Sequence, residues 1–192
     1  MSKLIGSINV TLDGCCDHRL VIADEELLRY ATELLESAAG LLFGRVTYEM
    51  FREYWPALVE SGSGAPAEVV FARALDAKPK YVVSRQPGVV GWNTAIVRGD
   101  DFAQEIRVLK QRVAGDLVVF GSPALARALV QSGEIEELHL LLQPIFAGHG
   151  PRIFEGLTDP LRLDHVESRA FRSGVILSRY VPRAGSDVSS PK

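Results

Sequence analysis

Leu117 to Leu129 reads Leu-Val-Val-Phe-Gly-Ser-Pro-Ala-Leu-Ala-Arg-Ala-Leu, an apolar strand that passes through one glycine directly into a helix start. Ser122 belongs to the residue types that cap helices, and Pro123 suits the first helical turn. Gly121 lets the backbone approach a ligand closely, and a helix N-terminus presents unpaired N–H groups that attract anions. This junction therefore predicts a phosphate site.

A second junction of the same kind lies at Leu41 to Phe51, Leu-Leu-Phe-Gly-Arg-Val-Thr-Tyr-Glu-Met-Phe. A buried-type strand meets Gly44, and a helical pattern follows with Arg45 and Thr47 at its start. Two phosphate cradles in one small domain suit a dinucleotide. Such turns are also common in α/β proteins that bind nothing, so a purely structural role for each junction stays open.

The composition is that of one ordinary globular domain, with 192 residues, 47% hydrophobic and 23% charged. A formal net charge of −3 and a pI near 5.8 provide no overall positive field, which argues against nucleic acid and membrane as partners. The sequence has neither an apolar run of membrane-spanning length nor a signal-peptide pattern. We expect a cytoplasmic protein.

Cys15 and Cys16 are the only cysteines, and sequence neighbours very rarely pair with each other. A reducing compartment is consistent with that. Asp17 and His18 follow them, but zinc ligands usually come in spaced pairs from two segments, and no second pair exists. We therefore expect no metal.

Strand and helix patterns alternate through the first two thirds of the chain. Apolar and polar residues alternate from Leu4 to Asp13, which predicts a strand with one buried face and one exposed polar face. Asp24, Glu25 and Glu26 predict the start of a helix that Gly40 ends. Further segments are a helix from Thr47 to near Pro56, a mobile loop from Ser61 to Pro66, a helix from Ala67 to Asp76, a strand from Lys80 to Ser84, a turn at Pro87-Gly88, a strand from about Thr94 to Val97, and a helix that Asp100 and Asp101 open.

The last third predicts mainly strands. The apolar character of Glu137 to Ile145 indicates a central strand. The segments from about Leu161 to Phe171 and Val175 to Val181 predict an antiparallel hairpin at the sheet edge. We therefore predict a single domain over residues 1–183, a three-layer α/β/α fold with a mostly parallel sheet and an antiparallel C-terminal edge, and a disordered tail at 184–192.

Several short segments in this order resemble the dihydrofolate reductase-like superfamily, particularly the branch of the C-terminal reductase domain of riboflavin biosynthesis proteins. The resemblance covers nearly the whole chain. The segments are Ser7 to Gly14, Phe43 to Glu49, Tyr81 to Arg85, Phe120 to Ser122, and Glu137 to His139 with Pro144 and the glycine-rich turn after it.

The resemblance implies a reductase that uses NADPH. It places Gly44, Arg45 and Thr47 near the phosphates, and Gly121, Ser122, Ala124 and Leu125 along the pyrophosphate and nicotinamide. Arg45 with Ser84 and Arg85 can clamp an adenosine 2′-phosphate, which would favour NADPH over NADH. A role for Arg85 as a solvated loop arginine stays open.

For the substrate, we expect a small heterocycle of the pyrimidine or pteridine type. The expected lining is Asn9 and Thr11 of the first strand with Met50, Tyr54 and Trp55 of the following helix, although helical spacing equally suits a core role for the last three. The resemblance also implies a homodimer, for which Leu138 to Leu142 could be a contact or simply intramolecular core.

A reductase of this kind also needs a proton source. Dihydrofolate reductases proper carry a carboxylate on the helix after the first strand, and the matching position here is Leu28. Asp13 is the best remaining candidate, as a proton donor or a substrate anchor, although an aspartate beside a glycine also suits a turn, and water could serve instead. The chain also has no zinc-deaminase motif, so the riboflavin resemblance concerns the reductase step alone.

We therefore predict an NADPH-dependent reductase of a C=N or C=O bond, most similar to the riboflavin-pathway reductase domain. One alternative is a nucleotide-binding sensor or scaffold that has kept the cradles without catalysis. Another is a hydrolase that uses Ser122, but Phe-Gly-Ser-Pro-Ala lacks the second glycine of a nucleophile elbow.

Overall fold

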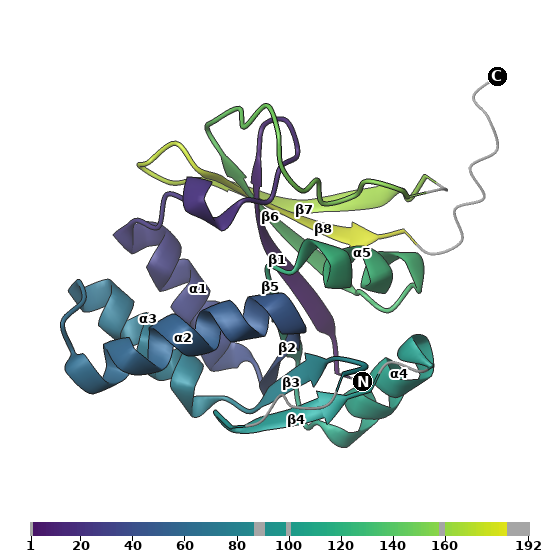
Figure 1. The fold of residues 1–192 in the computed structure, drawn as a ribbon. Helices are drawn as coiled ribbons and strands as arrows, with labels where there is room; N and C mark the ends of the chain where they lie inside the picture. Colours follow the sequence, from purple (N-terminus) through teal and green to yellow (C-terminus); the bar gives the residue numbers. More distant parts are fainter. Residues whose placement is uncertain (1, 87–90, 99–100, 158–159, 184–192) are drawn as a thin grey trace.

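Within the described residues, eight strands form one sheet in the order β4-β3-β2-β5-β1-β6-β8-β7, with helices on both faces (Figure 1). The computed structural model describes residues 2–86, 91–98, 101–157 and 160–183. The elements are β1 (Leu4–Thr11), η1 (His18–Leu20), α1 (Glu25–Ser37), β2 (Gly40–Gly44), α2 (Arg45–Ser61), α3 (Pro66–Ala77), β3 (Lys80–Val83), β4 (Thr94–Val97), α4 (Phe102–Arg112), β5 (Leu117–Phe120), α5 (Pro123–Gln131), β6 (Glu137–Gln143), β7 (Leu163–Ala170) and β8 (Ile176–Pro182).

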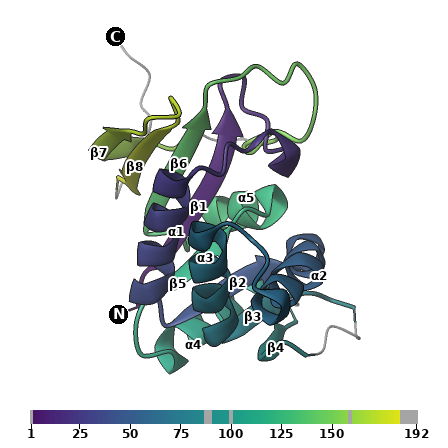
Figure 2. The ribbon, with the colours of Figure 1, turned by 90° about the vertical axis from the view of Figure 1, so that its left-hand side faces the viewer.

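The expected three-layer fold is confirmed. The strands from β4 to β6 are parallel, and β8 and β7 complete one edge as an antiparallel hairpin. Helices α1 and α3 cover one face of the sheet, and α4 and α5 cover the other (Figure 2). None of the described helices is both long and apolar enough to cross a bilayer. The predicted turn at Pro87-Gly88, the expected helix-opening Asp100 and the tail at 184–192 lie outside the described residues.

Helix α1 begins as predicted and ends earlier. Asp24 accepts a hydrogen bond from the Leu27 N–H at 2.8 Å, and acids occupy the first turn. The helix ends at Ser37, whereas Gly40 is the first residue of β2. A Cβ on Gly40 would lie 2.9 Å from the Tyr81 ring, so this glycine serves close strand packing rather than the helix end.

Helix α2 continues through Pro56 to Ser61, so the predicted end near the proline is wrong. Beyond Pro56 the helix is held by packing, because Leu58 is buried in the core. It ends at Gly62, which has a left-handed φ of 62° and donates its N–H to the Leu58 carbonyl at 2.9 Å. Only residues 62–65 then separate α2 from α3.

The polar side of β1 is buried, contrary to the prediction of an exposed polar face. Ser7 and Thr11 are 1% and 2% exposed. Helix α1 lies over this side of β1 (Figure 2) and packs its own apolar face there. Local alternation could not reveal that cover, because α1 reaches the strand only through the tertiary fold.

Strand β6 lies between β1 and β8, which confirms the predicted central strand. Leu138 and Leu141 are each 2% exposed and pack within the chain. Leu138 and Leu141 are therefore intramolecular core, whereas Leu140 and Leu142 are only partly buried. A dimer contact at this segment stays a prediction.

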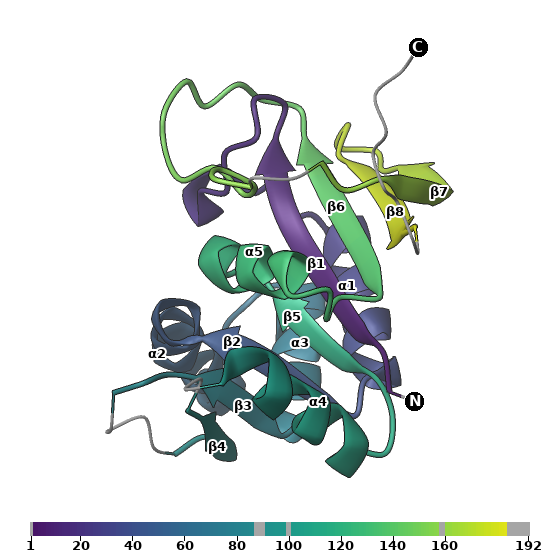
Figure 3. The same cartoon turned by 90° about the vertical axis from the view of Figure 1, so that its right-hand side faces the viewer.

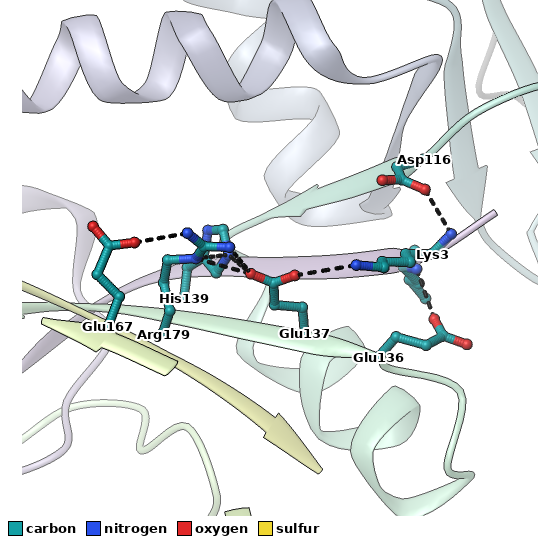
Figure 4. A network of polar contacts seen from close by, with 8 residues as sticks. Lys3, Asp116, Glu136, Glu137, His139, Glu167 and Arg179 are labelled. Atoms are coloured by element: carbon teal, nitrogen blue, oxygen red, sulfur yellow. Dashed lines mark hydrogen bonds and ion pairs between the residues drawn. The ribbon is translucent and has the colours of Figure 1, made fainter. Parts of the chain in front are cut away.

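A buried polar network joins the hairpin to α1. The Tyr30 hydroxyl lies 2.5 Å from His139 Nδ1, and His139 Nε2 lies 2.8 Å from Glu137 Oε1. Arg179 of β8 donates to the same Glu137 oxygen at 2.8 Å and to Glu167 of β7 at 2.7 Å (Figure 4). Burial outweighs the nearby carboxylate and lowers the pKa of His139, so its imidazole is neutral at pH 7.

This network predicts acid sensitivity. Folded His139 holds a proton less tightly than the unfolded chain, whose histidine titrates near 6.5. The free energy of unfolding should therefore have its full value above pH 6.5 and fall as the pH drops below it. Urea unfolding between pH 7.5 and 5 measures this slope.

The variant His139→Asn should flatten the slope of the free energy of unfolding between pH 7.5 and 5. His18→Asn is the matched control and should leave this slope unchanged, because the His18 side chain is 66% exposed. An unaltered slope in His139→Asn would show that other groups govern the acid sensitivity.

Candidate functional site

The two glycine junctions lie side by side at the carboxyl edge of the sheet, because β2 and β5 are parallel neighbours. A Cβ on Gly44 would overlap the hydroxyl oxygen of Ser122 and lie 3.7 Å from the Cβ of Leu125. A Cβ on Gly121 would lie 3.7 Å from Thr47 Cγ2. Each junction thus forms part of the wall of the other, and a side chain at position 44 would require the Ser122 hydroxyl to move.

Ser122 takes a conformation that the sequence did not predict. It is left-handed, with φ 55° and ψ 73°, and it follows Gly121 with φ 61°. Its carbonyl accepts the Ala126 N–H at 2.9 Å, but its side chain makes no capping hydrogen bond, so the predicted serine cap is wrong. The side chain lies against Gly44 instead. The first-turn N–H groups of α5, including those of Ala124 and Leu125, therefore have no side-chain cap.

The N-terminus of α2 also lacks a side-chain cap, because its N-cap residue is Gly44, which has no side chain that could accept a hydrogen bond. Two helix N-termini without side-chain caps, those of α2 and α5, consequently meet at one sheet edge. Each carries a partial positive charge. Helix N-termini of this kind attract anions, and the predicted phosphate site at this edge stays a prediction.

The close approach at Gly44 yields a stability prediction. Gly44→Ala should destabilise the fold by about 1–3 kcal/mol, because the added methyl group meets the Ser122 hydroxyl in a packed junction. Adding Ser122→Ala should recover part of this loss, since the nearest Ser122 atom is then its Cβ at 3.4 Å. Urea unfolding of the two single variants and the double variant measures the coupling. Strictly additive effects would contradict this contact.

Arginines gather along the same edge. Arg45 pairs with Glu49 at 3.4 Å and donates to the Gln86 side chain, which brings the start of α2 to the end of β3. Ser84 is buried, and its hydroxyl is engaged in the following turn, 3.1 Å from the Gln86 carbonyl. Arg85 is exposed. Arg45 and Ser84 thus both contact Gln86, and Arg85 lies between Ser84 and Gln86 in the chain. The predicted phosphate clamp of these three residues stays a prediction, and the Ser84 hydroxyl already has a partner.

The sequence reasoning missed Arg98. This exposed residue follows β4, and β4 pairs with β3 so that the Ser84 N–H donates to the Val97 carbonyl at 3.0 Å. Arg98 therefore follows the carboxyl end of a strand next to that of Arg85. In the described part of the chain, neither arginine forms an ion pair. The sequence showed only an arginine directly after a predicted strand. The β3–β4 pairing is what places this arginine next to the end of β3.

The carboxyl edge is stepped at β1. Strand β5 ends at Phe120, level with Ser7, while β1 continues to Thr11 beside β6. The Gly121 N–H donates to the Ser7 carbonyl at 3.1 Å, and the peptide groups of Asn9, two residues on, point to the same side. They have no neighbouring strand there among the described residues. The Asn9 side chain accepts from Gln143 Nε2 at 2.8 Å, which fixes its orientation.

The helix residues predicted to line a substrate separate into two groups. Thr47, Met50 and Tyr54 share one side of α2 at helical spacing, and Tyr54 is 50% exposed. Trp55 instead packs on Phe71 of α3 with ring centroids 4.8 Å apart, and it lies partly buried against the core. This packing favours a core role for Trp55, and a substrate role for Met50, Tyr54 and Trp55 stays a prediction.

Asp13 holds two loops together. Its carboxylate accepts hydrogen bonds from the Thr11 hydroxyl at 2.6 Å and from the N–H groups of Ala147 at 3.0 Å and Gly148 at 2.8 Å. These bonds, that of Thr11 first, hold the pKa of Asp13 well below its usual range. The group is ionised at neutral pH. Its predicted roles as a proton donor or a substrate anchor stay predictions. The three hydrogen bonds favour a structural role, as an anchor between the two loops that we call the Asp13 clasp.

Asp13→Asn tests that anchor. The amide has only one acceptor oxygen, so the N–H groups of Ala147 and Gly148 cannot both keep their present partners. Amide hydrogen exchange at these two residues should become faster, while exchange at Leu141 in β6 stays unchanged. Equal protection in both proteins would show that the clasp does not depend on the carboxylate.

The other candidate groups near this edge are not arranged for chemistry. Burial raises the pKa of the Cys16 thiol to about 12, so it is not a thiolate. Among the described residues no cluster of three or more His, Cys, Asp or Glu side chains suits a metal ion. The Ser122 hydroxyl has no hydrogen bond to a histidine or carboxylate within the same residues, and Leu28 is buried core.

This sheet order is that of the dihydrofolate reductase-like fold, which solved structures of low sequence identity share. The dihydrofolate reductase from Enterococcus faecalis, solved with NADP(H), matches with a TM-score of 0.61 at 13% identity, over 94% of this chain and 96% of that one. The Thermotoga maritima diaminohydroxyphosphoribosylaminopyrimidine deaminase/5-amino-6-(5-phosphoribosylamino)uracil reductase matches with a TM-score of 0.68 at 19% identity. That match covers 95% of this chain and 57% of the longer enzyme.

The sequence profile of the RibD C-terminal domain matches residues 2–177. The chain therefore belongs to the RibD C-terminal domain family, as its motifs indicated. A relative of nearly the same length is the uncharacterized protein YyaP of Bacillus subtilis (strain 168). It is 26% identical over 183 residues, which are 93% of this chain and 94% of YyaP.

Proposed function

We propose that this protein is an NADPH-dependent reductase of a C=N or C=O bond in a small heterocycle of the pyrimidine or pteridine type. The observation that carries the proposal is the meeting of two helix N-termini without side-chain caps at adjacent glycine junctions, beside exposed arginines. Family membership and the uracil reductase named for the Thermotoga relative support the same activity.

The cofactor's charged groups match the donors at this edge. The N-termini of α2 and α5 would bind the pyrophosphate, because their free N–H groups and partial positive charges lie close together. Arg45, Arg85 and Arg98, at the ends of β2, β3 and β4, would bind the adenosine 2′-phosphate. When bound, the nicotinamide supplies the hydride.

The open edge of β1 would orient the substrate. The Asn9 peptide offers a donor and an acceptor side by side, which match the amide-like edge of a pyrimidine ring. Met50 and Tyr54 supply apolar and aromatic surface for a flat ring. Such a wall would also exclude water from the reacting atoms.

Neither of the two positions considered for a proton donor carries a protonated acid. Asp13 is ionised and engaged with two loops, and the position of the reductase carboxylate is the buried Leu28. Water is therefore the proton source in this proposal, and the chain contributes position and electrostatics.

Cofactor titration tests the proposal. We expect NADPH to bind at least ten times more tightly than NADH, because only NADPH carries the 2′-phosphate. The double variant Arg45→Ala, Arg85→Ala should lose about 10- to 100-fold in NADPH affinity and little in NADH affinity, since a hydrogen bond between charged groups contributes about 1.5–3 kcal/mol. Nicotinamide fluorescence measures both affinities.

Arg29→Ala, which removes an exposed arginine from α1, is the matched control and should bind NADPH like the wild type. Equal loss of NADPH and NADH in the double variant would contradict the assigned phosphate contacts. Failure of the wild type to bind either nucleotide would overturn the cofactor assignment.

A second candidate function is a nucleotide-binding sensor that performs no reduction. Neither Asp13, which is ionised, nor the buried Leu28 provides a protonated acid, and this favours the sensor. NADPH oxidation across a panel of pyrimidines and pteridines separates the two functions, because a sensor binds the cofactor without turning over any substrate.

A further inference from the structure

A hydroxyl group without a partner lies at the inner end of the step in the sheet edge. Ser7 is 1% exposed, and its hydroxyl has no hydrogen-bond partner within the described residues. Buried polar groups in folded proteins are nearly always hydrogen-bonded, and those that are not are often found where a ligand binds or a reaction takes place. The Ser7 hydroxyl is therefore free to bond to a bound molecule.

Ser7 lies beside the place proposed for the substrate. Strand β5 ends level with Ser7, and β1 and β6 extend beyond it (Figure 3). Ser7 and Asn9 are on the same face of β1, about 7 Å apart along the strand. Helices α1 and α2 both pack on this face, through Tyr30 and Phe51 among others. A ring held between the Asn9 peptide and α2 would therefore lie next to the Ser7 hydroxyl.

Tyr30 and His139 continue from Ser7 into the interior. His139 is the partner of Ser7 across β1 and β6, so the two side chains are neighbours on one face. The Tyr30 hydroxyl lies 2.5 Å from His139 Nδ1. Burial raises the pKa of Tyr30, and the Ser7 hydroxyl lies close enough to oppose part of that shift. The phenol thus keeps its proton at neutral pH, between the Ser7 hydroxyl and the imidazole.

Glu137 determines which nitrogen of His139 carries the proton. Its Oε1 lies 2.8 Å from His139 Nε2, and an ionised carboxylate only accepts hydrogen bonds, so Nε2 carries the hydrogen. Neutral His139 therefore accepts the Tyr30 hydroxyl at the lone pair of Nδ1. When Nδ1 is protonated, this bond reverses, because Nδ1 then donates to the Tyr30 oxygen. The Tyr30 proton is then free to pass to Ser7.

Charged groups from three other segments face this pair. Arg179 of β8 bonds to Glu137 and to Glu167 of β7, and Lys3 lies 3.9 Å from the second Glu137 oxygen (Figure 4). Burial lowers the pKa of His139, while Glu137 opposes this shift. His139 is therefore mostly neutral at pH 7, and the fraction that carries two protons increases as the pH falls.

We infer that Ser7 is a catalytic residue that delivers the proton of the proposed reduction, and that Tyr30 and His139 replace this proton on Ser7. The inference rests on the proposed function. The C=N or C=O bond gains a hydride from NADPH on carbon and the Ser7 proton on nitrogen or oxygen. Its π bond breaks as these two bonds form, and NADPH is oxidised to NADP⁺.

The remaining protons move by one place each. The Ser7 oxygen takes the Tyr30 proton, and the Tyr30 oxygen takes the Nδ1 proton of doubly protonated His139, which becomes neutral. Water restores the proton on His139 after the product leaves, so water remains the ultimate source. The chain of groups places this proton at the reacting atom.

Nitrogen NMR of protein with labelled histidines tests this chain of groups without cofactor or substrate. In Tyr30→Phe the Nδ1 resonance of neutral His139 should shift, because its hydrogen-bond donor is lost. The variant His139→Asn assigns the signal. Ser173→Ala is the matched control, since Ser173 in the β7–β8 turn also has a buried hydroxyl without a partner among the described residues. An unshifted resonance in Tyr30→Phe would overturn the inference.

The rate of NADPH oxidation with a panel of pyrimidines and pteridines tests the role of Ser7. Ser7→Ala and Tyr30→Phe should each lower kcat about 10- to 100-fold, and the double variant should lose no more, because both changes interrupt one chain. NADPH affinity should stay within about twofold of the wild type, which also shows that the variants are folded. Ser173→Ala should keep the wild-type kcat.

The pH profile separates this role from a structural one. Wild-type kcat should fall about tenfold per pH unit above the pKa of His139 that NMR measures, and Ser7→Ala should lose this dependence. Full kcat in Ser7→Ala, or a wild-type profile that does not follow His139, would overturn this inference alone. A wild type that binds NADPH but reduces no compound of the panel would overturn the proposed reduction and this proton step with it.

Discussion

The contact between Gly44 and Ser122 is the constraint on which the candidate site depends. Strands β2 and β5 are hydrogen-bonded neighbours, so the helices that follow them start from adjacent points. They can start so close only because position 44 has no side chain and Ser122 adopts a left-handed conformation of about 1–3 kcal/mol strain. The conformation that costs this energy also removes the serine cap, which leaves the α5 N-terminus available to an anion.

The second element of the site is the step in the sheet edge. Strands β1 and β6 extend beyond the end of β5, and the Asp13 clasp holds the loops that follow them. Asp13 is the acid nearest in sequence to this step, and its three hydrogen bonds keep it ionised. The same residue cannot be both a low-pKa clasp and an efficient proton donor at neutral pH. Asp13, the acid nearest to the step, therefore has a structural role.

Local patterns predicted what local forces determine. The Asp24 cap and the two glycine junctions could be recognised because each depends on residues adjacent in sequence. The left-handed conformation of Ser122 could not be recognised, because it depends on Gly44, which lies 78 residues earlier in the sequence. The contact between Tyr30 and His139 likewise joins residues 109 positions apart. Trp55 at helical spacing fitted both core and cleft, and only its packing on Phe71 distinguishes them.

Strand alternation separates the charged from the uncharged residues of the hairpin. One side of β7 and β8 carries the charged residues, since Arg179 must reach both the buried Glu137 and Glu167. A strand places alternate residues on opposite faces, so gathering the charges on that side leaves the other side neutral. The buried network that joins the hairpin to α1 and the charge-free face therefore arise from the same sequence pattern. A one-residue shift in the pairing would abolish both together.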